Sequence, residues 1–316
     1  MKQTIRLFYC LIIALSHDVY AVAQPSAGAS SVALSTYIDP LVEEKAAGAT
    51  AVLENKLKQI IAANGFSDNL SRFVIAANMT VVTKDVLGTA PATFAYTVDL
   101  VLAIGDGTEG KKYASHFMTL KGVGTNPSKA LIHALRNVKA DDSAIQAFVA
   151  KGREQIMQYY NSRCDQFIKE VTLLGQQNHF DEALYRLMTV PDESSCYTNA
   201  LAAAERIYDQ KIQRDGKIKL LEAQNHWSAN PNREGANQVA RILKGIDPRS
   251  PNYSDVAAFA NTVGRRVVEI DGRAWDFKLD KEIGLERERI QAIRDIGIAW
   301  GNAQQSDVIY NVKHWW

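Results

Sequence analysis

Strand signals in this chain are confined to one part of the sequence, and that confinement limits the folds it can adopt. Residues 72–82 and 93–104 are rich in β-branched and aromatic side chains, and residues 113–123 resume the pattern after a glycine-rich break. Runs of this kind predict strands, and the short link between the last two predicts an antiparallel hairpin. Helical periodicity replaces them from Arg163 almost to the end. Strands and helices that are segregated along a chain indicate an α+β fold.

Helical patterns flank the three predicted strands. Before them, residues 40–64 carry an apolar face at helical spacing, made of Val42, Ala46, Ala49, Leu53, Leu57 and Ile60. Gly65 then suits the left-handed position that ends a helix. After them, one helix follows Gly124 and another is expected at 144–163. We therefore expect residues 37–160 to form a small antiparallel three-stranded sheet packed on helices.

The second half of the chain predicts only helices before its last residues. A helical hairpin is expected at 163–177 and 181–188. Further helices are expected at 195–214, 217–228, 233–245, 252–269 and 272–301. The last of them would bury a face made of Trp275, Leu279, Ile283, Ile290, Ile293 and Trp300. We expect residues 161–306 to form an all-α domain, followed by an extended aromatic tail at 307–316.

Residues 1–23 have the pattern of a secretory signal peptide. Two basic residues precede a short apolar run, residues 7–15, and small residues precede a cleavage site after Ala23. The alternative is an N-terminal core strand. Cys10 lies inside the apolar run without the small residues that a lipoprotein cleavage site needs, so a lipid anchor is not predicted. Residues 24–36 are small and polar, which predicts a flexible leader.

Charge and hydropathy restrict the partners of the mature chain. Removing residues 1–23 takes away two basic residues and one acid, and leaves equal numbers of each. A neutral chain without a dense basic patch does not favour nucleic acid, because phosphate binding needs clustered Lys and Arg. No further apolar run reaches about 18 residues, so no integral membrane span is expected after cleavage. Peripheral association with a membrane or envelope stays open.

The mature chain would keep two cysteines, Cys164 and Cys196, which are 32 residues apart. In an oxidising compartment they could form a disulfide. Stacked helices often hold equivalent positions too far apart to bridge, so two free thiols are the alternative. No CxxC or HxxxH spacing accompanies them, which does not favour a metal site.

The sequence GVGTNPSKA, residues 122–130, resembles a phosphate-binding loop but fails each template. A P-loop would need a second glycine and a hydroxyl around Lys129, and a dinucleotide fingerprint would need glycine in place of Pro127. A structural turn fits better, with the two glycines at positive φ, Asn126 as N-cap and Pro127 in the first helical position. The open helix N-terminus could still attract an anion, which is the alternative.

No other pattern in the sequence carries catalytic or metal-binding chemistry. GDGTEG, residues 105–110, lacks the alternating ligands of a calcium loop and predicts a hairpin turn. The acid pairs Glu43-Glu44 and Asp141-Asp142 stand where helices begin and predict capping. The six histidines lack metal-ligand spacing and predict surface or packing roles: His17, His116, His133, His179, His226 and His314. We expect no catalytic residue, no metal and no cofactor, and hence no enzyme.

Residues 163–268 resemble tetratricopeptide-type repeats in part. In the first unit, Ala183 takes the central small position and Phe180 the aromatic position before it, and the packing positions hold Phe167, Val171, Leu174 and Leu187. In the second unit, Ala236 takes the central position and Pro248 the closing proline, and the packing positions hold Leu220, Trp227, Ala240 and Leu243. Only two units match, and Pro191 comes four residues early in the first. A generic helical bundle is therefore the alternative.

The first half is similar, more weakly, to small α/β domains of exported bacterial envelope proteins of the curli-secretion-channel and Tol-translocation type. The resemblance depends on a long helix before a short antiparallel sheet and on FMTLKGVG leading into SKALIHAL. The resemblance implies an envelope location, in the periplasm or at the outer membrane, and a role in the assembly of envelope structures.

These patterns together predict an exported, non-enzymatic adaptor or scaffold of the cell envelope that binds a protein partner through its helical domain. A subunit of a larger particle or secretion machine, and a cell-wall-acting enzyme with an unrecognised site, are the alternatives. Tyr310, Trp315 and Trp316 in the tail are costly to expose to water. They are expected to dock either on the protein's own helices or on a partner.

Overall fold

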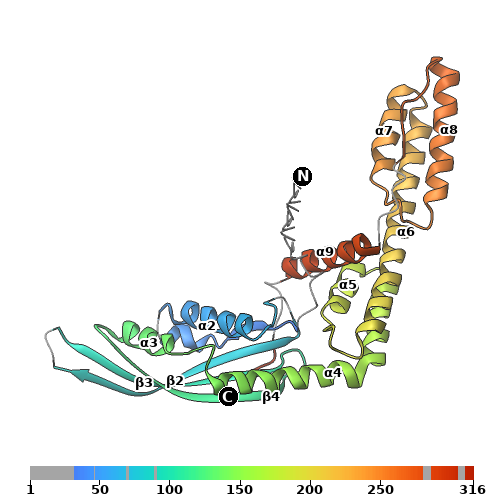
Figure 1. Ribbon diagram of the computed structural model, residues 1–316. Helices are drawn as coiled ribbons and strands as arrows, with labels where there is room; N and C mark the ends of the chain where they lie inside the picture. Colours follow the sequence, from blue (N-terminus) through green and yellow to red (C-terminus); the bar gives the residue numbers. More distant parts are fainter. Residues whose placement is uncertain (1–31, 46, 69–70, 89–90, 280–285, 305–309) are drawn as a thin grey trace, which may run out of the picture.

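The computed structural model describes residues 32–45, 47–68, 71–88, 91–279, 286–304 and 310–316. A sheet unit formed by the first half of the chain lies at one end, and a helical arm rises from it (Figure 1). Every element that follows the sheet in the described part of the chain is a helix. The predicted α+β class is therefore confirmed.

Four strands make one mixed sheet in the order β1-β2-β3-β4. β2 (Phe73–Leu87), β3 (Thr93–Asp106) and β4 (Lys111–Gly124) pair antiparallel, as the sequence predicts. β1 (Ser35–Ile38) was not predicted, and it pairs parallel with β2 at the edge. Four residues in a small, polar context give too weak a period to identify a strand.

The predicted flexible leader at 24–36 is wrong at its end. Val32 and Leu34 are each 1% exposed and belong to the main core, and Ser35 begins β1. Two apolar side chains among small residues therefore order this stretch against the first strand and helix. Residues 24–31 lie outside the described part of the chain.

Helices cover one face of the sheet. Alternate strand residues such as Met79, Leu100 and Leu102 point into a core shared with α2 (Ala49–Ala63) and α3 (Pro127–Arg136). The predicted helix at 40–64 is divided into α1 (Leu41–Lys45) and α2, because Gly48 adopts φ 78 between them. Five of its six predicted face residues are buried, and the sixth, Ala46, lies outside the described residues.

The glycine pair of the GVG stretch has a role other than the predicted one. Neither Gly122 nor Gly124 is among the glycines with positive φ, and both lie within β4. A Cβ atom on Gly122 would stand 2.1 Å from the backbone oxygen of Ala130 in α3. These glycines therefore allow a helix backbone to lie directly against a strand.

The helical half begins on a long helix shared with the sheet unit. α4 (Ser143–Gln176) packs its first half on β4 and bends at Arg163, whose φ of −119° is non-helical. The two helices predicted to meet at this residue are thus one helix with a kink. α5 (Phe180–Met188) and α6 (Tyr197–Ala229) follow, then α7 (Arg233–Lys244) and α8 (Tyr253–Asp271).

Two details of the helical prediction are wrong. α6 runs through the predicted break at 214–217, because Gly216 faces Ser250 and Asn252 at close range and does not end the helix. Residues 272–279 are not helical; Trp275 and Phe277 pack on each other there, against α8. α9 (Glu286–Gln304) forms only the last part of the predicted long helix. Ile283 of its predicted face lies outside the described residues.

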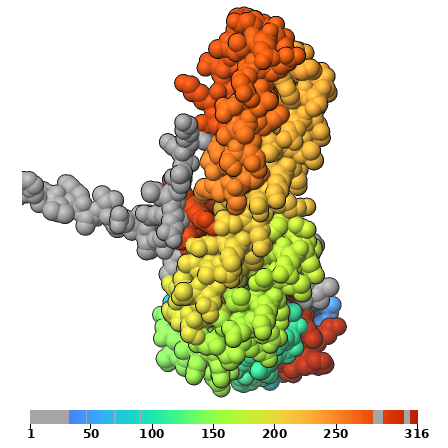
Figure 2. Space-filling model, turned by 90° about the vertical axis from the view of Figure 1, so that its right-hand side faces the viewer, coloured from blue at the N-terminus to red at the C-terminus, as the bar shows by residue number. Residues whose placement is uncertain are grey.

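The main hydrophobic core continues across the predicted domain boundary between residues 160 and 161. One cluster continues from the sheet through Tyr160 and Phe167 into α5, the first part of α6, and α9. A second cluster is formed by the end of α6, α7, α8 and residues 272–279. The 33 residues of α6 join the two over about 50 Å. Figure 2 shows the second unit standing above the first.

Candidate functional site

Cys164 and Cys196 are bonded to each other. Cys164 follows the kink of α4 directly, and Cys196 precedes the first residue of α6. Their Cα atoms are 5.4 Å apart, within the range that a disulfide needs. The bond therefore encloses α5 and fastens the start of the helical arm to the helix that leaves the sheet unit.

The aromatic tail docks on the protein itself, on the sheet and not on the helices. Trp315 is 2% exposed and forms a small core with Val312, Val74, Ala76 and Ala103 on the sheet face opposite α2 and α3. The sequence predicted docking on the protein's own helices, with a partner as the alternative, and the sheet was not considered; small side chains on this sheet face leave room for the ring. Trp316 remains 38% exposed. Residues 307–309 lie outside the described part of the chain.

Polar contacts fix the same tail to the sheet edge. The Tyr310 hydroxyl donates to the carbonyl oxygen of Ser71 at 2.9 Å, and its ring meets Tyr37 edge-on. Lys112 donates to the carbonyl oxygen of Trp315 at 2.7 Å. Tyr310 and Trp315 are thus used internally, and Trp316 is left as the accessible aromatic side chain of the predicted set.

The residues that resembled catalytic motifs have structural partners. Asn126 accepts the backbone N–H of Lys129 at 2.8 Å and caps α3, with Pro127 in the first turn as predicted. Asp106 of GDGTEG accepts the backbone N–H groups of Thr108 and Glu109 and so holds the β3–β4 turn. The predicted hairpin turn is confirmed. Asp142 caps α4 in the same manner.

Two of the histidines within the described residues have clear packing roles. His133 accepts the backbone N–H of Val123 at the edge of β4, at 3.1 Å, which protects part of an open strand edge. His116 packs beside the ring of Phe148. Within the ranges that the structure describes, no group of three or more His, Cys, Asp and Glu side chains could hold a metal ion. His17 lies outside those ranges.

A groove of about 470 Å³ lies between the end of α4, the start of α5 and the middle of α6. We name it the α5 groove. Its lining is polar and basic: Gly175, Gln176, Asn178, Phe180, Gln210, Gln213, Arg214, Lys217 and Ile218. It contains two cations and, among the described residues that line it, no carboxylate. The Arg214 guanidinium lies 5.9 Å from the Phe180 ring centroid, which holds it over the groove.

An apolar stripe extends the α5 groove along α6. Ile218 is 52% exposed and Leu221 is 58% exposed. Arg214, Ile218 and Leu221 are four and three residues apart, so they share one face of the helix. A basic groove that continues into exposed aliphatic side chains has the chemistry of a site for an acidic amphipathic segment. The sequence did not predict it, because the groove needs the fold of three helices to exist.

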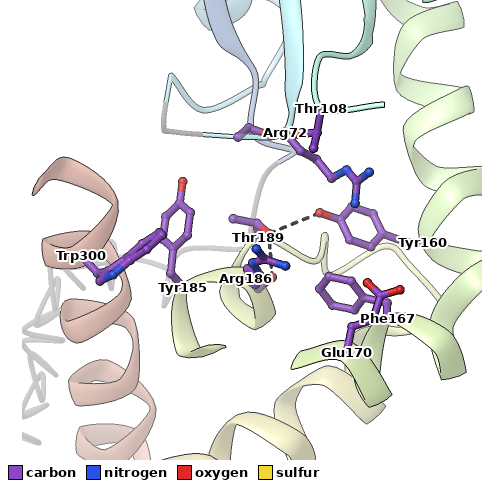
Figure 3. Close-up of a pocket in the computed structure, with 10 residues that line it drawn as sticks. Arg72, Thr108, Tyr160, Phe167, Glu170, Tyr185, Arg186, Thr189 and Trp300 are labelled. Carbon is purple, nitrogen blue, oxygen red and sulfur yellow. Dashed lines mark hydrogen bonds between the residues drawn. The ribbon is translucent and has the colours of Figure 1, made fainter. Parts of the chain in front are cut away.

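A second cavity, of about 180 Å³, lies where the sheet unit meets the helical arm. We name it the junction cavity. Figure 3 shows Tyr185 from α5 and Trp300 from α9 on one side, Tyr160, Phe167 and Glu170 from α4 on the other, and Arg72 above them. Tyr185 and Trp300 have ring centroids 5.2 Å apart. Burial raises the pKa of Tyr185, so its hydroxyl stays protonated.

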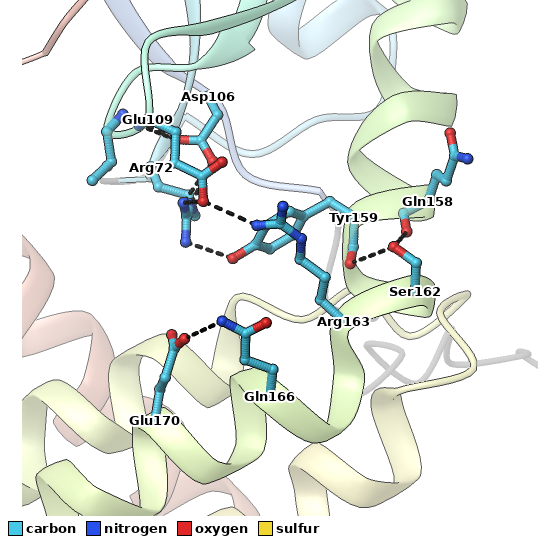
Figure 4. Close-up of polar contacts among 10 residues, drawn as sticks. Arg72, Asp106, Glu109, Gln158, Tyr159, Ser162, Arg163, Gln166 and Glu170 are labelled. Atoms are coloured by element: carbon cyan, nitrogen blue, oxygen red, sulfur yellow. Dashed lines mark hydrogen bonds and ion pairs between the residues drawn. The ribbon is translucent and has the colours of Figure 1, made fainter.

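An ion-pair network beside the junction cavity joins the sheet to the kink of α4. Arg72 donates to the fully buried carboxylate of Asp106, at 2.6 Å and 2.8 Å, and to Glu109 at 3.1 Å. Arg163, the kink residue, donates to the same Glu109 at 3.1 Å. Tyr159 lies between the two arginines, with both guanidinium groups near its ring (Figure 4). The network fixes Arg72 at the cavity wall.

Comparison with known proteins assigns no family. No protein-family model matches the chain, and no curated protein is significantly similar to it. Among solved structures it is similar to a minor lipoprotein from Acinetobacter baumannii, with 19% identity and a TM-score of 0.26. That alignment covers 40% of this chain and 95% of the other. At this identity and TM-score the likeness supports no inference about function.

In the part of the chain that the structure describes, no helix combines the length and the apolar character needed to cross a bilayer.

Proposed function

We propose that the protein is an exported, non-enzymatic adaptor or scaffold of the cell envelope, and that it binds a protein partner at the α5 groove. The observation that carries the proposal is the groove itself, with Arg214 and Lys217 beside exposed Ile218. Exposed aliphatic side chains next to uniform charge favour a partner that presents the opposite charge and an apolar stripe. The partner segment is therefore an acidic amphipathic helix or peptide.

The disulfide and the leader support export. Disulfides persist in oxidising compartments and are rare in the cytosol. The bond between Cys164 and Cys196 lies within the arm that carries the groove, and Cys196 is fully buried. The signal-peptide pattern of residues 1–23 agrees with that compartment. The mass of the mature protein tests this part: cleavage after Ala23 is expected, and an uncut chain in the cytosol would contradict it.

A tetratricopeptide-like organisation of the arm is part of the same proposal. Ala183 in α5 and Ala236 in α7 are both fully buried, as the central small position of such a repeat requires. Each lies in a short helix that follows a longer one, α4 and α6 respectively. Helix pairs of this type commonly form concave surfaces for peptides.

The proposal of a scaffold without catalysis is supported by the structural roles of the polar residues in the candidate motifs. Asn126, Asp142 and Asp106 are used in caps and a turn. The alternative of a cell-wall-acting enzyme would gain support from paired carboxylates at a cavity. Glu170 is the one carboxylate among the described residues that line the junction cavity. The mass of the native complex distinguishes an adaptor from a subunit of a larger particle, because a particle would exceed the mass of a one-to-one complex.

Site-specific crosslinking tests the partner site. A photoreactive residue at position 218 is expected to give a discrete protein adduct in intact envelopes of the producing cell. The matched control is position 270 in α8, because Ile270 is similarly exposed at 47% and lies away from the groove lining. Equal adducts from both positions, or none from 218, would contradict the proposal.

A further inference from the structure

We propose that the junction cavity binds one neutral pyranose ring, as a free sugar or as a single unit of a glycan. The cavity has a volume of about 180 Å³. An engineered protein cavity of about 150 Å³ accepts benzene. One six-membered ring with small polar substituents therefore fits the available space, and a disaccharide would have to leave its second ring at the surface.

The aromatic wall of the cavity is built by close helix packing. Gly297 and Gly301 are four residues apart on α9 and face α5. A Cβ atom on Gly301 would stand 2.5 Å from the ring of Tyr185, so the glycine lets that ring lie against the helix backbone. Trp300 lies beside the same ring. The two rings are inclined to each other by 41°, and the backbone of α9 holds the Tyr185 ring in place from behind.

A polar group at this wall has no partner. The Tyr185 hydroxyl is buried, and it makes no hydrogen bond with any residue that the structure describes. A buried hydroxyl without a partner is destabilising, and a ligand hydroxyl that reached it would satisfy it. Thr189 and Tyr160 also line the cavity, and their hydroxyl groups contact each other at 3.3 Å, while Thr189 donates to the carbonyl oxygen of Arg186 at 2.7 Å. A ligand with several hydroxyl groups matches this wall better than an apolar ring.

The charges around the cavity favour a neutral ligand. Arg72 is already paired with Asp106 and Glu109, and Arg186 pairs with Glu182 at 2.7 Å. A ligand anion would therefore have to compete with carboxylates that are already in place. Glu170, which accepts from Gln166 at 2.9 Å, offsets the positive charge of the two arginines, so neither sign of ligand charge is favoured. The arginines remain suited to donate hydrogen bonds to neutral hydroxyl groups.

Titration with simple glycosides tests the inference. The probes are methyl glucoside, methyl galactoside and the methyl glycoside of N-acetylglucosamine. Benzoate, an anion of similar ring size, and choline, a smaller cation, are the charged controls. Binding is followed by saturation-transfer NMR and by tryptophan emission, because Trp300 lines the site. We expect at least one glycoside to bind with a dissociation constant of about 1 mM, typical of so small a ligand. Preference for benzoate or choline, or no glycoside binding, would overturn the inference.

Three variants locate the binding. Tyr185→Phe removes only the orphan hydroxyl and is expected to weaken the glycoside about 3–10-fold. Trp300→Leu should weaken it about tenfold. Trp316→Leu, at an exposed tryptophan in the tail, should leave affinity unchanged. Unchanged affinity in Tyr185→Phe, whose near-isosteric side chain guards against misfolding, would overturn the inference even if Trp300→Leu failed to fold.

Discussion

The indole N–H of Trp315 donates a hydrogen bond to the carbonyl oxygen of Gly110, at a distance of 2.9 Å. Gly110 lies in the β3–β4 turn, where it adopts φ 71. The hydrogen bond therefore joins the tail to a turn that lies 205 residues earlier in the sequence. Gly105 leaves room for the same ring, because a Cβ atom there would stand 2.8 Å from it. The tail is thus a structural part of the sheet unit.

Replacing Trp315 should destabilise the protein strongly. Trp315→Ala removes a buried ring and a hydrogen bond, and we expect the free energy of unfolding to fall by about 3–5 kcal/mol. Trp316→Ala is the matched control, and its effect should stay within about 0.5 kcal/mol. Urea unfolding followed by circular dichroism measures both. Equal effects of the two substitutions would show that the tail does not dock through Trp315.

Reducing the disulfide should loosen the helical arm. The bond between Cys164 and Cys196 closes a loop with a sequence separation of 32 residues, for which loss of chain entropy predicts a contribution of about 3–4 kcal/mol. Adding a thiol reductant should therefore lower the urea midpoint of the wild-type protein. The double variant Cys164→Ser and Cys196→Ser should start lower and show no response. A response of the double variant, or none in the wild type, would contradict the bond.

A methyl group at Gly122 should disrupt the packing of α3 on β4. In Gly122→Ala the new Cβ atom meets backbone atoms of Ala130 and Ala134 at 2.1 Å and 2.4 Å, and neither can rotate away. We expect a loss of at least about 2 kcal/mol in unfolding free energy. Gly88→Ala is the control, since nothing lies within 4 Å of its Cβ position. Thermal unfolding of both variants checks this, and a mild effect at Gly122 would refute the close approach.

Stability should depend on acid pH through Asp247. Burial acts to raise the pKa of Asp247, but hydrogen bonds from Arg249 and Tyr208 outweigh it, and the net pKa is lowered. A carboxyl with a lowered folded pKa stabilises the fold above its unfolded pKa of about 3.9, and this stabilisation is lost as pH falls through the folded pKa. Asp247→Asn should therefore melt earlier than wild type at pH 6.

The gap in melting temperature between wild type and Asp247→Asn should shrink as the pH is lowered from about 6 to about 3. Asp276→Asn, at an exposed position outside the network, serves as the control and should show a small gap at every pH. If the difference in melting temperature between wild type and Asp247→Asn did not change with pH, the ionised carboxylate would stabilise the fold no more than the protonated one, which would contradict the prediction.

The sequence predicted those parts of the fold that depend on local chemistry. The caps at Asn126 and Asp142, the antiparallel hairpin around GDGTEG and the left-handed Gly65 follow from the preferences of single residues. Parts that depend on distant neighbours were not predicted. The helix break predicted between 214 and 217 is absent, because the missing side chain of Gly216 accommodates Ser250 and Asn252 from a turn about 35 residues away.

The candidate sites were beyond sequence reasoning for the same reason. The α5 groove combines three helices, and the junction cavity combines the residues just before β2, the β3–β4 turn, α4, α5 and α9. No local pattern links Arg72 to Trp300. One signal was present in the α9 sequence, since Gly297 and Gly301 at a spacing of four residues indicate a close helix contact, here with Tyr185.

Charge reversal in the α5 groove tests whether this groove binds the partner. The purified double variant Arg214→Glu and Lys217→Glu is compared with wild type in recovering the partner that crosslinks at position 218, with Arg265→Glu and Arg266→Glu on α8 as the control pair. We predict at least a tenfold loss of recovery for the groove variant, a normal melting temperature, and full recovery for the control pair. Undiminished recovery by the folded groove variant would contradict the claim that this groove binds the partner.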